Sequence, residues 1–201
     1  DVKGFSFDMQ KTQIVQEISR IFSDFRATGL ADFLDDNAQK QFFAVNMEMG
    51  EGETVGALKF LCHCLYRRYG KKTIILLDEY DTPLQEAWVE GFWPETVKLL
   101  RNLFNATFKT NPYLERALLT GITRVSRESM FSDLNNICVC STTAAQYMTC
   151  CGFTEAEVFA ALDEYGLTDR AGVKAMYDGY TFGTTHGIYN PWSIVSYLKD
   201  S

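Results

Sequence analysis

Two adjacent carboxylates, Asp78 and Glu79, directly follow an apolar run at residues 73–77. A continuous apolar run predicts a strand covered on both faces, as in a parallel sheet with helices on each side. The carboxyl ends of such strands form the edge at which open α/β sheets bind ligands. In nucleotide hydrolases the first carboxylate helps to hold Mg²⁺ and the second orients or activates the attacking water. Asp78 and Glu79 are candidates for these two roles in that order.

A second apolar strand is expected to end at Thr120, directly before a glycine. The Thr120 hydroxyl could contact an attacking water or a terminal phosphate, or it could only cap a turn. Arg124 and Arg127 follow closely and could bring positive charge to a developing phosphate anion, as arginine fingers do. The alternative for these two arginines is a surface role, paired with Glu128 or Asp133.

Asp81 adds a third acid close to the first two. Asp78, Glu79 and Asp81 together permit a second hypothesis, a metal-dependent phosphodiesterase. Three acids at the end of one strand offer few independent directions for binding a pair of metal ions, so this hypothesis ranks last.

A phosphate-binding loop is missing from these 201 residues. Such a loop reads Gly-x-x-x-x-Gly-Lys-Ser/Thr, so that backbone amides, the lysine and the hydroxyl surround the phosphates. The glycine-rich stretch at residues 50–56 contains acids, which would repel phosphate, and it lacks the Lys-Ser/Thr pair.

Composition narrows the function classes. The formal net charge of −7 and the absence of a basic cluster along a face argue against direct nucleic-acid binding by this segment. No apolar run approaches the ~20 residues that span a bilayer, and the first residues do not resemble a signal peptide. The sequence therefore predicts a cytoplasmic location and no membrane partner.

Six cysteines stand close to one another in the sequence, as Cys62 and Cys64, Cys138 and Cys140, and the adjacent pair at residues 150–151. Spacings of one residue or none differ from the two to four intervening residues of structural zinc sites. Zinc is therefore the less favoured interpretation, and buried, reduced thiols acting as small apolar residues are expected instead.

Helical spacing of apolar residues predicts helices from residue 8 to Gly29, over about 55–69 and from Pro94 onward. Residues 1–7 are expected to form a short strand. Alternating helices and strands predict an α/β layered fold. A capping box at Thr154 and a cap at Asn190 predict two later helices. We place a domain boundary near residue 150, which gives domains 1–150 and 151–201.

Several blocks of the chain, taken in order, resemble the predicted AAA-ATPase-like family of bacterial P-loop NTPases. The central block contains Leu76-Leu77-Asp78-Glu79-Tyr80-Asp81-Thr82-Pro83, and a later one reads Leu119-Thr120-Gly121-Ile122-Thr123-Arg124. The resembling blocks are residues 60–84, 100–104, 119–131, 134–136, 152–155, 177–180 and 189–194. Several motifs in the same order are more specific than any single motif. Together they extend from about residue 55 to the end of the chain, and weakly before that.

The resemblance implies a truncated AAA-like core with a three-layer parallel sheet, followed by a small, mainly helical C-terminal subdomain. Asp78 and Glu79 would be the Walker B residues, with Asp78 holding the metal, and Thr120 would lie on the sensor strand. In the family the phosphate loop lies upstream, so ATP and Mg²⁺ are expected in the full-length protein and an isolated chain without the loop is expected to be inactive. Relatives often carry a PD-(D/E)XK nuclease-like domain.

Two further expectations follow. A sheet without its upstream strand would present an uncovered edge, which favours a dimer or a swapped arrangement. The alternative to an ATPase is a nucleotide-independent interaction module, in which the aromatic stretch at residues 177–192 docks a partner domain. That stretch could equally be the core of the small domain.

Overall fold

The structure is a computed structural model, which describes residues 6–122, 130–131, 134 and 137–200. The chain divides into two compact units, Asp1–Asn136 and Ile137–Ser201, and each is described by itself. The predicted domain boundary near residue 150 remains a prediction. The first unit contains α1 (Phe7–Ala27), the 3₁₀ helix η1 (Leu30–Phe33), α2 (Asp36–Ala44), α3 (Glu51–Tyr69), β1 (Thr73–Leu77), α4 (Thr82–Glu90), α5 (Trp93–Phe108) and β2 (Leu114–Leu119).

Helix α1 ends at a glycine, as its sequence predicts, and begins at a polar cap. The Ser6 hydroxyl accepts a hydrogen bond from the Met9 amide, and Gly29 adopts a left-handed φ of 68° after the last turn. Ile14, Ile18 and Phe22 are spaced four residues apart and are buried on one face. Of the strand expected at residues 1–7, residues 1–5 lie outside the described part, and Phe7 already belongs to α1.

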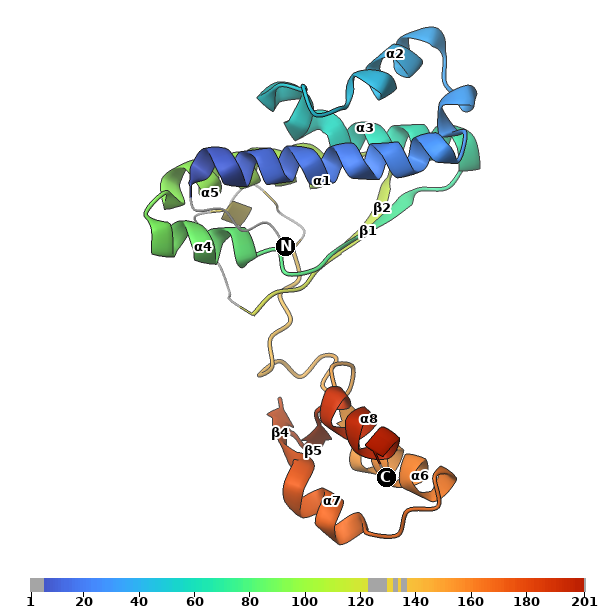
Figure 1. Cartoon of the computed structure of the whole chain (residues 1–201), viewed down its shortest axis with the longest axis vertical. Coiled ribbons are helices and arrows are strands. Elements are labelled where there is room, and N and C mark those ends of the chain that lie inside the picture. Colours follow the sequence, from blue (N-terminus) through green and yellow to red (C-terminus); the bar gives the residue numbers. More distant parts are fainter. Residues whose placement is uncertain (1–5, 123–129, 132–133, 135–136, 201) are drawn as a thin grey trace. The chain divides into compact units, whose positions relative to one another are not determined.

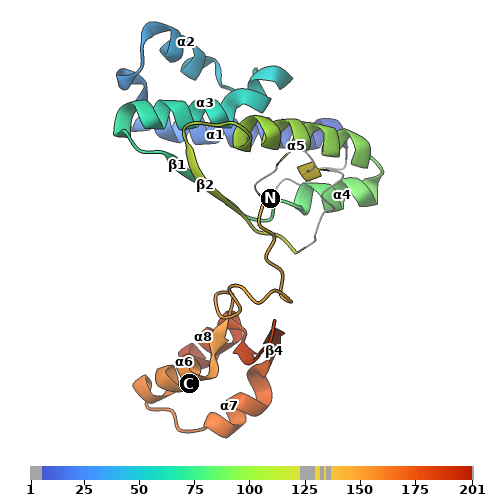
Figure 2. The same ribbon diagram turned by 180° about the vertical axis from the view of Figure 1, so that it is seen from behind.

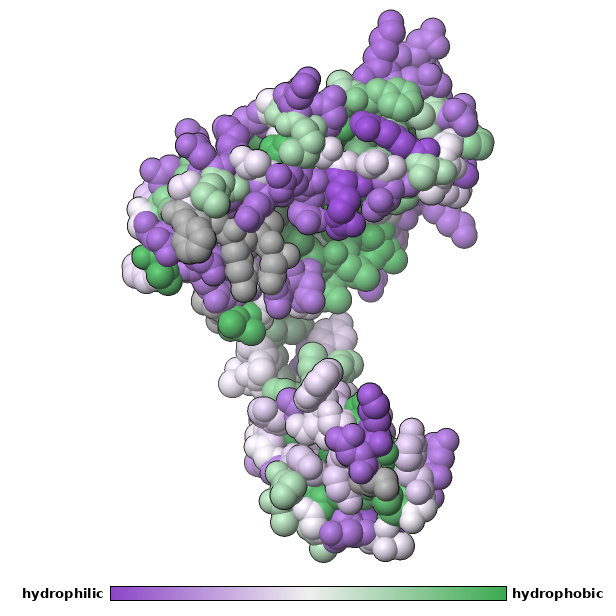
Figure 3. Space-filling view, in the orientation of Figure 1, coloured by the Kyte–Doolittle hydropathy of each residue, from purple (hydrophilic) through white to green (hydrophobic). Residues whose placement is uncertain are grey.

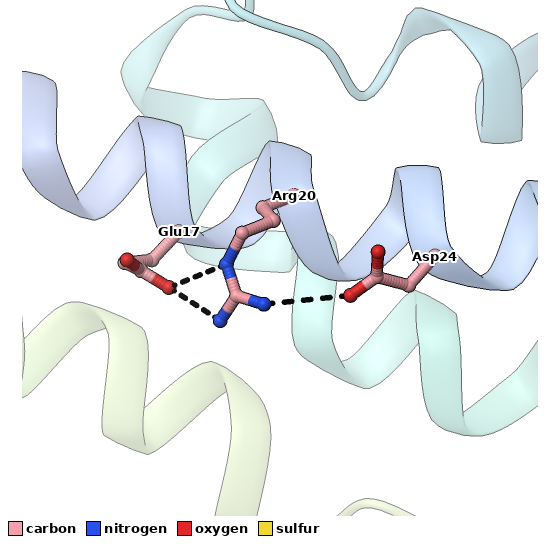
Figure 4. A network of polar contacts seen from close by, with 3 residues as sticks. All are labelled: Glu17, Arg20 and Asp24. Atoms are coloured by element: carbon pink, nitrogen blue, oxygen red, sulfur yellow. Dashed lines mark hydrogen bonds and ion pairs between the residues drawn. The ribbon is translucent and has the colours of Figure 1, made fainter.

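The outer face of α1 carries charged residues that pair along the helix. Arg20 donates from Nε and Nη2 to Oε2 of Glu17, and its Nη1 lies 3.4 Å from Oδ2 of Asp24 (Figure 4). All three side chains are exposed, and ion pairs of this kind add little to stability. They mark the face of α1 that points to solvent.

A buried polar contact ties α1 to the two helices that follow β1. Gln10 is fully buried, and its Nε2 donates to the carbonyl oxygen of Pro83 at 2.8 Å. The hydroxyl of Thr96, also fully buried, donates to Oε1 of Gln10 at 2.7 Å. Each polar atom of the Gln10 side chain therefore has a partner, which fixes how α1 crosses α4 and α5.

Strands β1 and β2 form a parallel pair in which Ile75 lies opposite Ala117 and Leu77 opposite Leu119. Helices α1, α3 and α5 lie along one side of this pair (Figures 1 and 2). The prediction that residues 73–77 are covered on both faces is wrong for the described structure. Exposure alternates along β1, because the described helices cover only one side of the pair.

The uncovered side of the pair is an apolar face, which we define by Ile74, Leu76 and Leu118. These side chains are exposed to 61%, 74% and 58%. Hydrophobic residues gather over the β1–β2 sheet in Figure 3. The chain is thus an α/β protein, but its described residues form a two-stranded parallel sheet in place of the predicted three layers.

Helix α4 is an element that the sequence analysis does not predict. Pro83 stands in its first turn, where a missing amide hydrogen costs nothing, and Gly91 ends it with a φ of 85°. Pro83 therefore helps to begin a helix directly after the acidic strand end.

The second unit contains β3 (Phe153–Thr154), α6 (Glu155–Glu164), α7 (Arg170–Tyr177), β4 (Asp178–Phe182), β5 (Thr185–Tyr189) and α8 (Pro191–Asp200). The sequence predicts a mainly helical subdomain, and the structure adds a three-stranded antiparallel sheet in the order β3-β5-β4. The aromatic, glycine-rich stretch forms the β4–β5 hairpin of this sheet. The predicted caps are present, since Thr154 accepts from the amide of Glu157 and Asn190 accepts from that of Ser193.

The core of the second unit is made of Val158, Leu162, Val173, Tyr189 and Ile194. The aromatic stretch at residues 177–192 could be core or docking surface, and it contains both buried and exposed aromatic residues. Tyr189 is fully buried, whereas Trp192 is 81% exposed. No helix among the described residues is long and apolar enough to cross a membrane.

Candidate functional site

The ends of β1 and β2 bring Asp78 and Thr120 into contact. Backbone pairing continues past the strands, because the Thr120 amide donates to the Leu77 carbonyl at 2.9 Å and the Tyr80 amide donates to the Thr120 carbonyl at 3.0 Å. The Thr120 hydroxyl donates to Oδ1 of Asp78. Two residues that lie 42 positions apart in the sequence therefore meet at the carboxyl edge of the sheet, where α/β folds bind ligands.

Glu79 has an unusual backbone conformation. Its φ is 51°, in the left-handed region that non-glycine residues seldom occupy. In this conformation the Glu79 amide donates to Oδ1 of Asp78 at 3.0 Å, and the Glu79 carbonyl accepts from the amide of Thr82 at 3.1 Å. Such conformations cost about 1–3 kcal/mol and are concentrated at functional sites. The left-handed turn thus links the end of β1 to the start of α4 and leaves the Glu79 side chain exposed.

Asp78 is exposed and accepts both of these hydrogen bonds through the same oxygen. Among the described residues, hydrogen bonds to its carboxylate use Oδ1 only. Carboxylate, hydroxyl and water oxygens are the ligands that Mg²⁺ takes, usually with one or two carboxylates and several waters. Asp78 and Thr120 therefore fit the donor chemistry of a magnesium site.

Asp81 is only 1% exposed and differs from the other two acids in this respect. Gln85, one turn later in α4, donates from Nε2 to Oδ2 of Asp81 at 2.9 Å. The backbone carbonyl of Asp81 accepts from the amides of Leu84 and Gln85, both at 3.0 Å, and so begins α4. Asp81 is a buried structural acid whose carboxylate is turned away from solvent.

The phosphodiesterase hypothesis requires the three acids to converge on one pair of metal ions. The structure does not bring them together in this way, because Asp81 is buried. Within the described ranges, no group of three or more His, Cys, Asp or Glu side chains is placed to hold a metal ion. The prediction of buried thiols is correct for two of the six cysteines. Cys62 and Cys64 are buried, and burial raises the pKa of the Cys64 thiol to about 12. The four later cysteines are exposed, because they lie in the irregular segment before β3 and not in a core.

Gly121 presses against the loop that follows β1. A Cβ atom at this position would lie 2.8 Å from Cγ of Asp81 and 2.9 Å from Cε1 of Tyr80. The Tyr80 ring in turn packs edge-on against Phe131, with ring centroids 5.6 Å apart. The two strand ends can therefore approach closely only because residue 121 has no side chain.

The predicted site residues are thus partly brought together. Asp78, Glu79 and Thr120 share the carboxyl edge of the sheet. Arg124 and Arg127 lie outside the described residues, so their roles stay predictions. Gln85 and Gly121, which position the strand ends, were not predicted from the sequence, although the Asp81–Gln85 spacing of one helical turn was a signal for the first of them.

Comparison with known proteins agrees with the ordered motifs. The model of a family described as predicted AAA-ATPase matches residues 2–131, which include the strand ends carrying Asp78 and Thr120. The match begins earlier than residue 55 and stops before the second unit. No solved structure matches the chain.

A curated relative, the uncharacterized protein in the vnfD 5′ region of Azotobacter chroococcum mcd 1, is 32% identical over 131 residues. This alignment covers 63% of the chain but only 24% of the relative, so the chain spans about a quarter of that protein's length. With the family model matching well over half of its residues, the chain belongs to the predicted AAA-ATPase family.

Proposed function

We propose that this chain is part of a protein that binds and hydrolyses ATP, and that β1 is its Walker B strand and β2 its sensor strand. The observation that supports this most is the contact of Thr120 with Asp78 at the carboxyl edge of two parallel strands. A hydroxyl and a carboxylate are brought to the edge where nucleotides bind in α/β sheets. Family membership adds an independent argument.

Each residue has a proposed role. Asp78 would hold Mg²⁺ directly or through water, and Thr120 would fix the orientation of the Asp78 carboxylate. Glu79 would orient and deprotonate the attacking water, which its exposed side chain leaves room for. Mg²⁺ would neutralise charge on the phosphates. Arg124 and Arg127 remain proposed as the source of positive charge near the terminal phosphate.

The apolar face of Ile74, Leu76 and Leu118 is where the rest of the ATPase core is proposed to pack. All-parallel sheets are covered on both faces in α/β proteins, and exposed apolar strands are otherwise prone to pair with another chain. The segment that carries the phosphate-binding loop would supply this cover in a longer protein. A chain that lacks the segment is expected to self-associate through the same face, which light scattering can measure.

Titration with Mg-ATP tests the proposal. These 201 residues are compared with a longer chain that also contains the upstream phosphate-binding loop of the family, and binding is followed by calorimetry. We expect tight binding only for the longer chain, since the loop provides most contacts to the phosphates. A matched variant, Asp78→Asn in the longer chain, should lose the Mg²⁺ dependence of binding. Failure of the longer chain to bind any nucleotide would overturn the proposal.

A further inference from the structure

Two cysteines of the second unit lie next to each other on the surface and have no place in the proposed ATPase site. Cys138 and Cys140 are both exposed, and their sulfur atoms are 3.9 Å apart. A disulfide needs an S–S distance of about 2.05 Å, so the two sulfurs must move only about 2 Å closer. Two thiols at this separation are suited to thiol–disulfide chemistry.

A third side chain completes the arrangement. Oε1 of Gln146 lies 3.7 Å from Sγ of Cys138 and 3.7 Å from Sγ of Cys140, so it accepts weak hydrogen bonds from both thiols. Tyr147, the next residue, has a φ of 61°, a conformation that non-glycine residues rarely adopt. The chain is therefore turned sharply at the point where the amide oxygen is presented to the thiols.

The segment that carries Gln146 is docked on the β4–β5 hairpin. The Gly183 amide donates to the carbonyl of Thr142 at 2.7 Å, and the Thr184 amide lies 3.4 Å from Sδ of Met148. A Cβ on Gly183 would lie 2.8 Å from the carbonyl oxygen of Ala144, so the two segments are in close contact. The hydrogen bonds of Gln146 thus connect the thiol pair to a segment that is held in place by the β4–β5 hairpin.

We propose that Cys138 and Cys140 form a redox-active dithiol that low-molecular-weight disulfides, such as glutathione disulfide, convert to an intramolecular disulfide. The thiolate of one of the two cysteines attacks one sulfur of glutathione disulfide, the S–S bond breaks, and glutathione thiolate leaves. The thiolate of the other cysteine then attacks the protein sulfur of the mixed disulfide and releases a second glutathione. Two electrons and the two thiol protons pass to two glutathione molecules, which become reduced.

The two thiols also influence each other. The pKa of the Cys140 thiol is raised, first by desolvation and then by the hydrogen bond and charge of Cys138. Formation of the disulfide removes both thiol protons, whichever sulfur reacts first. In the disulfide neither sulfur carries a proton, so the contacts to Gln146 are lost. Oxidation accordingly releases Gln146 from the pair.

The proposal is tested on the full chain by equilibrating it in buffers with a series of ratios of reduced to oxidised glutathione. The samples are then quenched with acid, alkylated and analysed by peptide mapping. The expected product is a peptide in which Cys138 and Cys140 are linked, with the same midpoint in the Cys150→Ser/Cys151→Ser double variant. Cys140→Ser should accumulate glutathione on Cys138, and Cys138→Ser should accumulate it on Cys140, because each variant lacks the second thiol that resolves the mixed disulfide. Gln146→Leu should shift the equilibrium toward the disulfide by about two- to fivefold, because it removes bonds made only by the thiols.

Two outcomes would overturn it. The first is a wild-type chain in which the Cys138–Cys140 peptide stays reduced at every glutathione ratio. The second is a disulfide that forms only with Cys150 or Cys151.

Discussion

The hydroxyl of Thr120 donates a hydrogen bond to Oδ1 of Asp78, so the ends of β1 and β2 are joined through side chains as well as through the backbone. Replacing Thr120 by valine keeps the shape of the side chain and removes the donor. We expect Thr120→Val to lower the free energy of unfolding by about 0.5–1.5 kcal/mol, measured by urea denaturation. Thr120→Ser keeps the hydroxyl and should lose less. Equal losses in the two variants would mean that the hydrogen bond contributes nothing.

Close approach at Gly121 gives a second prediction. Gly121→Ala places a methyl group against Asp81 and Tyr80 and should destabilise the chain by about 1–3 kcal/mol. Gly56, inside α3, is the matched control, since a Cβ there meets no atom within 4 Å. Gly56→Ala should stabilise the helix by about 0.5–1 kcal/mol. Thermal unfolding of both variants measures the difference, and a harmless Gly121→Ala would show that the strand ends can separate freely.

The buried contact between Gln10 and Thr96 gives a third prediction. Thr96→Val leaves Oε1 of Gln10 buried without its donor, which should cost about 1–3 kcal/mol of unfolding free energy. Thr12 is a matched threonine, because its hydroxyl also donates to an oxygen of α1 but is exposed. Thr12→Val should change stability by less than about 0.5 kcal/mol. If denaturant unfolding gave the two variants the same stability, the buried contact would have no special weight.

These contacts separate what the sequence could predict from what it could not. The helix ends at Gly29 and Thr154 follow from local chemistry, and the prediction is confirmed at both. The alternation of helices and strands was enough to predict an α/β chain. Coverage of the sheet was mispredicted because an apolar run does not reveal which of its faces meets a neighbour, and Ile74 and Leu76 proved exposed.

The site was predictable in its residue types and less so in its geometry. Asp78 and Glu79 stand out as acids after a strand, whereas nothing local shows that Thr120 is the residue opposite Asp78. That pairing depends on the register of β1 against β2, which is set by contacts between distant segments. The burial of Asp81 also depends on such contacts, because Gly121, which packs against it, lies just after the second strand.

An exposed ion pair in the second unit makes a prediction about pH. Glu155 pairs with Lys174 and also accepts from the Tyr189 hydroxyl at 3.3 Å. The hydrogen bond from Lys174 lowers the pKa of Glu155, so its stabilising effect is present above pH 4.5 and is lost as the pH falls through the folded-state pKa. The bond to Glu155 raises the pKa of Lys174 above 10.5, so its effect is present below pH 10.5 and is lost at higher pH.

Tyr189 also makes the stability of the folded state fall at high pH, because burial raises the pKa of its phenol to about 12. Stability of the second unit should therefore fall on both sides of a plateau between about pH 5 and 10. Glu155→Gln should flatten the acid side, because it removes a carboxylate whose pKa is lowered in the folded state. Denaturant unfolding at a series of pH values measures this, and an acid limb unaltered in Glu155→Gln would refute it.

The central claim is tested most directly by measuring ATP hydrolysis. The measurement uses a longer chain that contains the phosphate-binding loop, both as the wild type and as the Glu79→Gln variant. If Glu79 orients and activates water, the variant should bind Mg-ATP as tightly as the wild type while the turnover rate falls by about 10²–10⁴-fold. Glu90→Gln, an exposed glutamate at the end of α4, should keep the wild-type rate. Wild-type turnover in Glu79→Gln, or parallel loss of binding and turnover, would contradict the catalytic role.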